Sequence, residues 1–427
     1  KEARTYVRTL RRDDSRSRAL LEATIRTGRT HQIRVQLAHE QLPVAGDTEY
    51  GGAPALRVLL HAHRLVFRHP VTSERVEVTA PAPMELEDWL VHGQRAAYRD
   101  PALLQRALAL AVEARYALRR AHAAGTTTTF RLVHEEADGF PGLAVEVFGD
   151  WLVLRVLDDV ARADEDSVLD ALHALGYRGI YVKRHPKQAN ELVDPGSEQI
   201  APHTPARGSA APEVLEVYEH GLPFEVRLHD GLRTGLFLDQ RGNRQRVREL
   251  AAGKRVLNLF SYTGSFSIAA LAGGAQVAVS VDTSRVALEW ADRNAARIGA
   301  SDRHRSLARD AFEALAMLEK RGERFELVIV DPPSYSTSKR GRFRVTKDYE
   351  ALCAAALGVL SDGGSLLACL NHHGVSQAML RRFVQGAAQA RRLSLESLRD
   401  LPTPRDFPSA PGVSPPAKHV LASLQAR

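Results

Sequence analysis

The stretch that decides the fold runs from residue 255 to residue 282 and reads RVLNLFSYTGSFSIAALAGGAQVAVSVD. Its two apolar segments, Arg255–Leu259 and Val277–Val281, have the length and composition of buried β-strands. Between them, a glycine turn at Gly264 precedes the small and apolar residues of a packed helix, Ser265–Ala272. A strand, a helix and a second strand in this order predict two parallel strands joined by a crossover helix.

The same alternation continues towards the C-terminus. Further apolar strands are expected at Phe325–Val330 and Gly364–Cys369. Helical spacing of apolar residues predicts helices at Arg285–Ile298, Phe312–Arg321 and Lys347–Leu360. Strands buried on both faces, each followed by a helix, are typical of a doubly wound parallel sheet. We therefore expect residues 213–427 to form a Rossmann-like α/β domain.

Acidic residues follow successive strands of this predicted sheet. Asp282 follows the second strand, Asp310 follows the third strand position, and Asp331 follows the fourth. In a doubly wound sheet, ligands bind at the carboxyl ends of the strands. Asp282 lies about 20 residues after the glycine turn, where a ribose diol is usually held, and Asp310 could accept a hydrogen bond from an adenine amino group. The turn lacks the GxGxxG of nicotinamide enzymes, which argues against a dinucleotide.

Three further segments precede this domain. Residues 1–93 are expected to form short strands and loops, and residues 94–125 a linker helix. Residues 126–212 are expected to form a small central α/β domain, which begins with a hairpin of Leu143–Val147 and Trp151–Leu157.

The composition narrows the classes of partner. The 427 residues carry a net charge of +7, which fits either a solvated surface or a polyanion such as RNA. Two cysteines are too few for a disulfide framework, and no apolar run approaches the roughly 20 residues of a membrane helix. We therefore expect a cytoplasmic protein that is not bound to a membrane.

Residues 126–427 contain stretches that resemble the bacterial large-subunit ribosomal RNA methyltransferases that modify cytosine C5 or guanine N7. The matching stretches are Arg131–Val133 with Glu136–Leu143, Gly231–Arg244, Asn258–Phe266 and Asp331–Tyr335. The resemblance implies a class I methyltransferase domain that uses S-adenosylmethionine (SAM), with large-subunit ribosomal RNA as partner. The sequence leaves the oligomeric state open.

The expected site joins the strand-end residues to those that the resemblance implies. The expected SAM-binding residues are Thr234, Gly235, Asp239, Arg241, Asn258, Phe260, Gly264, Asp282, Asp310 and Asp331. For Asp239 and Arg241, a surface ion pair is the alternative interpretation. The expected catalytic residues are Asp331, Pro332, Pro333, Tyr335 and Cys369, with Tyr335 placed to stack on a base extruded from the RNA. No metal site is expected.

Cys369 bears on which base is methylated. Cytosine C5 is not nucleophilic, so its methylation needs a thiolate that adds to C6, whereas guanine N7 has a lone pair and needs only alignment. Cys353 is expected to be core filler, and Cys369 lies at a strand end on the ligand-bearing edge. The cytosine branch carries two cysteines in this region, and Asn371 replaces the second, so both chemistries stay open.

Residues 19–83 resemble the C-terminal part of the RluA-like pseudouridine synthases. The resemblance rests on Thr27–Arg34, on Leu42–Asp47 with Tyr50 and Gly51, and on Leu60–Leu65 with His69 and Pro70. The family's catalytic aspartate lies upstream of these motifs and is missing from this chain. Either the chain is part of a bifunctional pseudouridine synthase and methyltransferase, or the segment persists as an RNA-binding module. A non-catalytic RNA-binding protein with a degenerate methyltransferase fold is the remaining alternative.

Overall fold

The computed structural model describes residues 3–426, except 54, 56, 94–95, 158, 163, 186–196, 334, 339–340, 373 and 410–414. At 48, 159–160, 335–338 and 341–344 it describes the backbone alone. The chain divides into two compact units. One unit comprises Lys1–Ala107, Glu135–Pro141 and Ser409–Val413, and the other comprises Leu108–His134, Gly142–Pro408 and Ser414–Arg427. Within these described ranges, no helix is long and apolar enough to cross a membrane.

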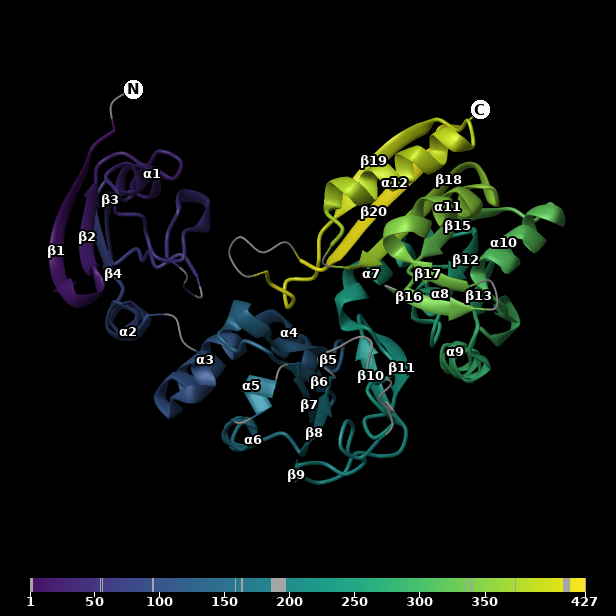
Figure 1. Ribbon diagram of the computed structural model, residues 1–427, viewed down its shortest axis with the longest axis horizontal. Helices are drawn as coiled ribbons and strands as arrows, with labels where there is room; N and C mark the ends of the chain where they lie inside the picture. The colour runs from purple at the N-terminus through teal and green to yellow at the C-terminus, as the bar shows by residue number, and fades with distance from the viewer. Residues whose placement is uncertain are drawn as a thin grey trace. The chain divides into compact units, whose positions relative to one another are not determined.

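The first unit contains two antiparallel hairpins and short helices (Figure 1). The hairpins are β1 (Thr5–Asp13) with β2 (Arg18–Ile25), and β3 (Arg64–Arg68) with β4 (Arg75–Thr79); the α-helices are α1 (Gln32–His39) and α2 (Met84–His92). The motifs that resemble pseudouridine synthases meet here, because the Arg34 guanidinium donates two hydrogen bonds of 2.7 Å to the buried Asp47 carboxylate. This bidentate pair holds the pKa of Asp47 below its usual range and fixes the loop that follows α1.

The second unit contains a five-stranded sheet within the range in which a central α/β domain is predicted, and the same unit also contains the C-terminal sheet. Its strands are β5 (Thr129–His134), β6 (Leu143–Phe148), β7 (Trp151–Val156), β8 (Gly179–Arg184) and β9 (Arg207–Gly208), in that order. The predicted hairpin is confirmed as β6–β7, and α6 (Glu165–His173) connects β7 to the parallel strand β8. The predicted linker helix is two helices, α3 (Pro101–Ala114) and α4 (Tyr116–Ala123), which are separated at Arg115.

A seven-stranded sheet forms the core of the C-terminal domain and confirms the predicted fold class. Its order is β14 (His304–Ala308), β13 (Val277–Asp282), β12 (Arg255–Leu259), β15 (Phe325–Val330), β18 (Leu360–Asn371), β20 (Ala417–Leu424) and β19 (Leu395–Leu401). The first five strands are parallel, and the last two pair antiparallel. The strand order reverses at β12, so the sheet has a switch point between β12 and β15.

Helices cover both faces of this sheet. One face packs on α10 (Ala311–Lys320), α11 (Val345–Leu357) and α12 (Gln377–Ala390). The other face packs on α7 (Arg241–Leu250), α8 (Ser265–Ala272), α9 (Arg285–Arg297) and the hairpin of β10 (Leu215–Glu219) with β11 (Leu222–Val226). Both faces are therefore apolar, and the carboxyl ends of the parallel strands are where polar residues gather.

Candidate functional site

Asp282 lies at the carboxyl end of β13, and its carboxylate orders the turn that follows β12. Its two oxygens accept hydrogen bonds from the backbone N–H groups of Tyr262 and Ser284, at 2.9 Å each. Asp310 lies after β14 and caps α10, since its Oδ1 accepts from the backbone N–H of Phe312 at 3.0 Å. The structure therefore places both predicted acids at one edge of the sheet, on neighbouring strands.

The turn between β12 and α8 has an unusual backbone. Phe260, Tyr262 and Gly264 have φ values of +56°, +49° and +76°, in the left-handed region. A Cβ atom at Gly264 would lie 2.6 Å from the Cβ of Ala291 in α9, so close packing of this helix also demands glycine. The left-handed residues turn the chain sharply and leave its backbone next to Asp282. Non-glycine residues in this conformation cost free energy and gather at functional sites.

Several buried polar atoms around this turn have no hydrogen-bond partner. They are the hydroxyl oxygens of Thr234 and Ser261 and the side-chain carbonyl oxygen of Asn258. Buried polar groups are normally satisfied, so orphaned ones need an explanation, and a ligand with matching polar groups is one. Thr234, Asn258 and Asp282 are among the SAM-binding residues expected from the sequence, and Ser261 adds a further polar group beside them. Their contact with SAM stays a prediction.

Aromatic rings flank the same turn. The Tyr262 ring lies 5.4 Å from the Phe237 ring and 6.3 Å from the Trp290 ring, and the Arg233 guanidinium lies 6.0 Å from the Tyr262 ring. Burial raises the pKa of Tyr262 to about 12, so its hydroxyl stays protonated. A Cβ atom at the predicted residue Gly235 would lie 2.4 Å from Trp290, which explains the glycine at that position.

Asp331 directly follows β15, and the charge of the Asp239 side chain acts on it. Gln240 Nε2 donates a hydrogen bond of 3.1 Å to Asp331 Oδ2, and Asn243 Nδ2 donates one of 2.6 Å to Gln240 Oε1. Burial, and next the negative charge of Asp239, raise the pKa of Asp331 to about 7. Burial also raises the pKa of Asp239. Two carboxyl groups that share a site and resist ionisation are frequent at catalytic centres.

Arg241 forms an ion pair with Asp406 and not with Asp239, so the predicted alternative of an Asp239–Arg241 surface pair is wrong. Asp406 is fully buried and also accepts a hydrogen bond of 2.9 Å from the backbone N–H of Arg131 in β5. Sequence reasoning gave no role to Asp406, because it is 165 residues from Arg241 and 275 from Arg131 along the chain.

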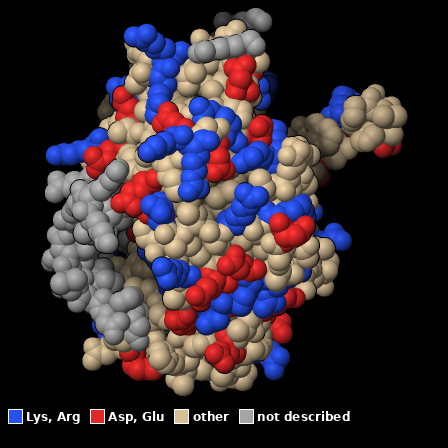
Figure 2. Space-filling view, turned by 90° about the vertical axis from the view of Figure 1, so that its right-hand side faces the viewer, with Lys and Arg blue, Asp and Glu red and all other residues tan. Residues whose placement is uncertain are grey.

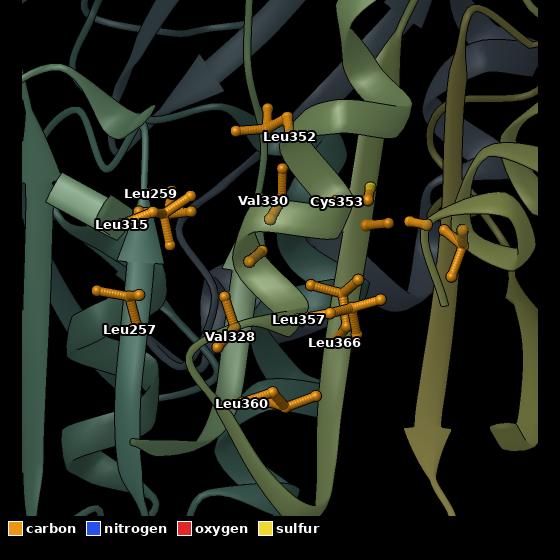
Figure 3. Close-up of a cluster of buried hydrophobic side chains, with 14 of the residues drawn as sticks. Leu257, Leu259, Leu315, Val328, Val330, Leu352, Cys353, Leu357, Leu360 and Leu366 are labelled. Atoms are coloured by element: carbon orange, nitrogen blue, oxygen red, sulfur yellow. The ribbon is translucent and has the colours of Figure 1, made fainter. Parts of the chain in front are cut away.

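Both cysteines of the chain are buried. Cys353 packs in the core between α11 and the sheet, among Leu352, Leu357 and Leu366 (Figure 3). Cys369 is fully buried in β18, and Asn243 Nδ2 lies 3.8 Å from its sulfur. Burial, and then the nearby Asp331, raise the pKa of the Cys369 thiol well above its ordinary value. A thiol in these surroundings is held in its protonated, poorly nucleophilic form.

The structure places most of the remaining site residues that were expected from the sequence. Pro332 is buried and Pro333 is exposed in the segment that follows β15. Phe260 is half-buried against the core of α10 and α11. The backbone of Tyr335 begins the short strand β16 (Tyr335–Ser338), but its side chain lies outside the described residues, so its stacking role stays a prediction. Among the described side chains, no three His, Cys, Asp or Glu residues gather to hold a metal ion.

Curated proteins that are similar to this chain include large-subunit ribosomal RNA methyltransferases. Ribosomal RNA large subunit methyltransferase I of Aeromonas salmonicida is 33% identical over 263 residues, which are 61% of this chain and 65% of the relative. The protein of the same name from Escherichia coli K12 is 34% identical over 246 residues, 56% of this chain and 60% of the relative. The chain thus spans less than two thirds of the length of these relatives.

Solved structures agree with the fold. A methyltransferase crystallised in complex with SAH is 26% identical with a TM-score of 0.66, over 76% of this chain and 82% of that one. The structure of a SAM-dependent methyltransferase from Streptococcus mutans is also 26% identical, with a TM-score of 0.65 over 76% of this chain and 81% of that one.

Two family models match the chain. The model of RNA pseudouridylate synthases matches residues 1–39, in agreement with the resemblance of the first segment. The model of S-adenosylmethionine-dependent methyltransferases matches residues 205–422, which include the acids at the sheet edge and the turn at Gly264. The chain uses SAM as its cofactor and belongs to the family of S-adenosylmethionine-dependent methyltransferases.

Proposed function

We propose that this protein transfers a methyl group from SAM to a base of large-subunit ribosomal RNA, with guanine N7 as the acceptor atom. The cluster of Asp282, Asp310 and Asp331 at one sheet edge is the observation that supports methyl transfer from SAM. The relatives named large-subunit ribosomal RNA methyltransferases support the RNA substrate. This substrate would place the enzyme in the cytoplasm. The intact acids and orphaned polar atoms argue against a degenerate, non-catalytic methyltransferase fold.

The burial of both cysteines supports guanine N7 over cytosine C5. Addition to cytosine C6 requires a thiolate, and neither Cys353 nor Cys369 is accessible or easily ionised. Guanine N7 needs only to be held in line with the sulfonium methyl group. The carboxylate of Asp331 would then stabilise the positive charge that passes from the sulfonium to the base. SAM would supply the electrophilic methyl group, while Thr234, Ser261 and Asp282 would hold its polar groups.

The proposal is tested by incubating the purified protein with isotope-labelled SAM and unmodified large-subunit ribosomal RNA. The RNA is then digested to nucleosides and analysed by mass spectrometry. We expect labelled 7-methylguanosine. Labelled 5-methylcytidine would overturn the choice of base, and the absence of any labelled nucleoside would overturn the RNA substrate.

Replacement of Cys369 separates the two chemistries directly. We expect Cys369→Ala to retain methylation within about threefold, because transfer to a nitrogen lone pair involves no thiolate. The matched control is Cys353→Ala. It removes an equally buried thiol from the hydrophobic cluster between α11 and the sheet, away from the candidate site. If Cys369→Ala loses all activity while Cys353→Ala keeps it, and both bind SAM normally, Cys369 is the nucleophile and guanine N7 is the wrong acceptor.

Asp282 is predicted to hold the ribose of SAM. Asp282→Ala should weaken SAM binding at least tenfold, which is about 1.4 kcal/mol, because it removes a charge-assisted acceptor and loosens the turn at Tyr262. Isothermal titration calorimetry measures this change. Asp302→Ala, which removes an exposed carboxylate from the same domain, is the control and should bind SAM normally. If both variants bind SAM with equal affinity, Asp282 does not hold the cofactor.

A further inference from the structure

A second concave site lies on the central domain, apart from the residues of the candidate SAM site. It is a pocket of about 310 Å³, which we name the α4 pocket. Its lining residues come from α3, from α4, from the turn between β6 and β7, and from the turn between α6 and β8: Val112, Arg119, His122, Ala123, Asp150, Leu175, Gly176, Tyr177 and Arg178. Nothing in the proposed methyl transfer uses these residues.

The two arginines of the α4 pocket differ from their neighbours in lacking acidic partners. On the same domain, Arg207 pairs with Asp166 and Asp170, and Arg184 pairs with Glu165. The face drawn in Figure 2 likewise shows basic and acidic side chains intermixed. By contrast, no ion pair joins Arg119 or Arg178 to any carboxylate in the described part of the chain. Their guanidinium groups thus keep their donors for a ligand.

Arg178 is held in place without a carboxylate. Its guanidinium lies over the Trp151 ring at 5.0 Å, and its backbone N–H donates a hydrogen bond of 2.8 Å to the Asp150 carbonyl oxygen. A guanidinium that is fixed by stacking loses little conformational entropy when it binds, and its fork of N–H groups matches the oxygens of a phosphate.

Two aromatic side chains contribute to the wall of the pocket. Tyr177 is half-buried, and burial raises its pKa, while the charges of Arg119 and Asp150 act on its phenol from nearby. His122 is anchored by a contact of 2.8 Å between its Nε2 and the Gly149 carbonyl oxygen. The pocket therefore combines two available cations, a phenol ring and one carboxylate, in a volume at the small end of ligand sites.

We propose that the α4 pocket binds one nucleotide of the RNA substrate, with Arg119 and Arg178 on its phosphate and Tyr177 against its base. This inference rests on the proposed action on RNA and adds a contact outside the methyl-transfer site. Arginine pairs with phosphate and aromatic rings that stack on bases are the usual means of holding single-stranded RNA. The Asp150 carboxylate would accept from a base N–H group, which favours a nucleotide over a free phosphate ion.

The test measures RNA binding, so it does not depend on methyl transfer. A fluorescein-labelled transcript from bacterial large-subunit ribosomal RNA is titrated with the protein at several salt concentrations. The double variant Arg119→Gln/Arg178→Gln should bind about tenfold more weakly, and the slope of log K against log[salt] should fall by about 1. Arg207→Gln is the control, because it removes the charge of an arginine that already pairs with Asp166 and Asp170, and it should leave the slope nearly unchanged. Tyr177→Leu should weaken binding without changing the slope, because it removes stacking and no charge.

The outcomes separate this proposal from the proposed function. Equal salt slopes for the wild type, the double variant and Arg207→Gln would overturn the α4 pocket as an RNA site, whether or not the wild type methylates RNA. If the wild type methylates no RNA but the double variant alone loses affinity, the proposed function fails and the pocket stands. Where both hold, the double variant should raise KM for RNA and leave kcat and SAM affinity unchanged.

Discussion

Replacing Asp331 with asparagine should reduce the rate of methyl transfer by about 10²–10³, the size of effect seen when one group that stabilises transition-state charge is removed. The asparagine side chain keeps the shape and can still accept the hydrogen bond from Gln240, so the fold should persist. Single-turnover transfer from saturating SAM measures the loss. The control is Asp362→Asn, which neutralises an exposed carboxyl group near the start of β18. A rate within tenfold of the wild type would show that the Asp331 carboxylate carries no charge role.

The raised pKa of Asp331 gives this residue a signature in pH. Because its carboxyl group ionises near pH 7 in the free protein, kcat/KM for SAM should rise with pH through about 7, and Asp331→Asn should lack that rise. Stability changes in the opposite direction. Between pH 3.8 and about 7 the folded protein keeps a proton that the unfolded chain releases, so this group's contribution to folding stability falls as pH rises through that window.

The buried ion pair between Arg244 and Glu219 should give the largest stability effect. Arg244 donates hydrogen bonds of 2.7 and 2.6 Å to the two carboxylate oxygens of Glu219, and the two side chains are only 2% and 3% exposed. Arg244→Met would leave the carboxylate buried without a partner, which costs about 3–5 kcal/mol. Chemical denaturation should report this loss, and the melting temperature should fall by about 10 °C.

Two controls make the ion-pair prediction specific. The double variant Arg244→Met/Glu219→Leu should recover most of the lost stability, because it removes both charges and leaves apolar side chains in the core. Arg246→Met breaks the exposed pair with Glu249 on the same helix and should cost under about 1 kcal/mol. If Arg244→Met and Arg246→Met destabilise equally, the buried pair contributes nothing beyond a surface contact.

The sequence predicts the parts of the fold that depend on short-range pattern. The ranges Arg255–Leu259 and Ser265–Ala272 agree with β12 and α8 residue for residue, because buried strands and a glycine turn leave strong local signals. The edge strand β19 and its neighbour β20 do not follow from the sequence pattern. The segment LESLRDL of β19 is half-exposed and rich in charge, and β20 buries Lys418 and His419, so neither has the apolar pattern of a core strand.

In the candidate site, too, the sequence predicts the residues that depend on local pattern and not the contacts between distant residues. Asp282, Asp310 and Asp331 could be predicted, because parallel strands bring their carboxyl ends to one edge of a sheet. The hydrogen bond between Gln240 and Asp331 and the contact between Asn243 and Cys369 could not be predicted, since they join residues 91 and 126 positions apart along the chain. A polar residue that satisfies a buried partner looks, in sequence, like any solvated one.

Asp406 has a consequence for how the protein could be divided or recombined. One carboxylate bonds both to the backbone of the central sheet, at Arg131, and to the first helix of the methyltransferase domain, at Arg241. The Asp406 carbonyl oxygen also accepts a hydrogen bond of 3.2 Å from Arg115, where the linker helices meet. The central and methyltransferase domains are therefore not interchangeable modules. A chimaera that grafts either domain onto a relative must therefore take the residues at positions 115, 131, 241 and 406 from the same parent protein.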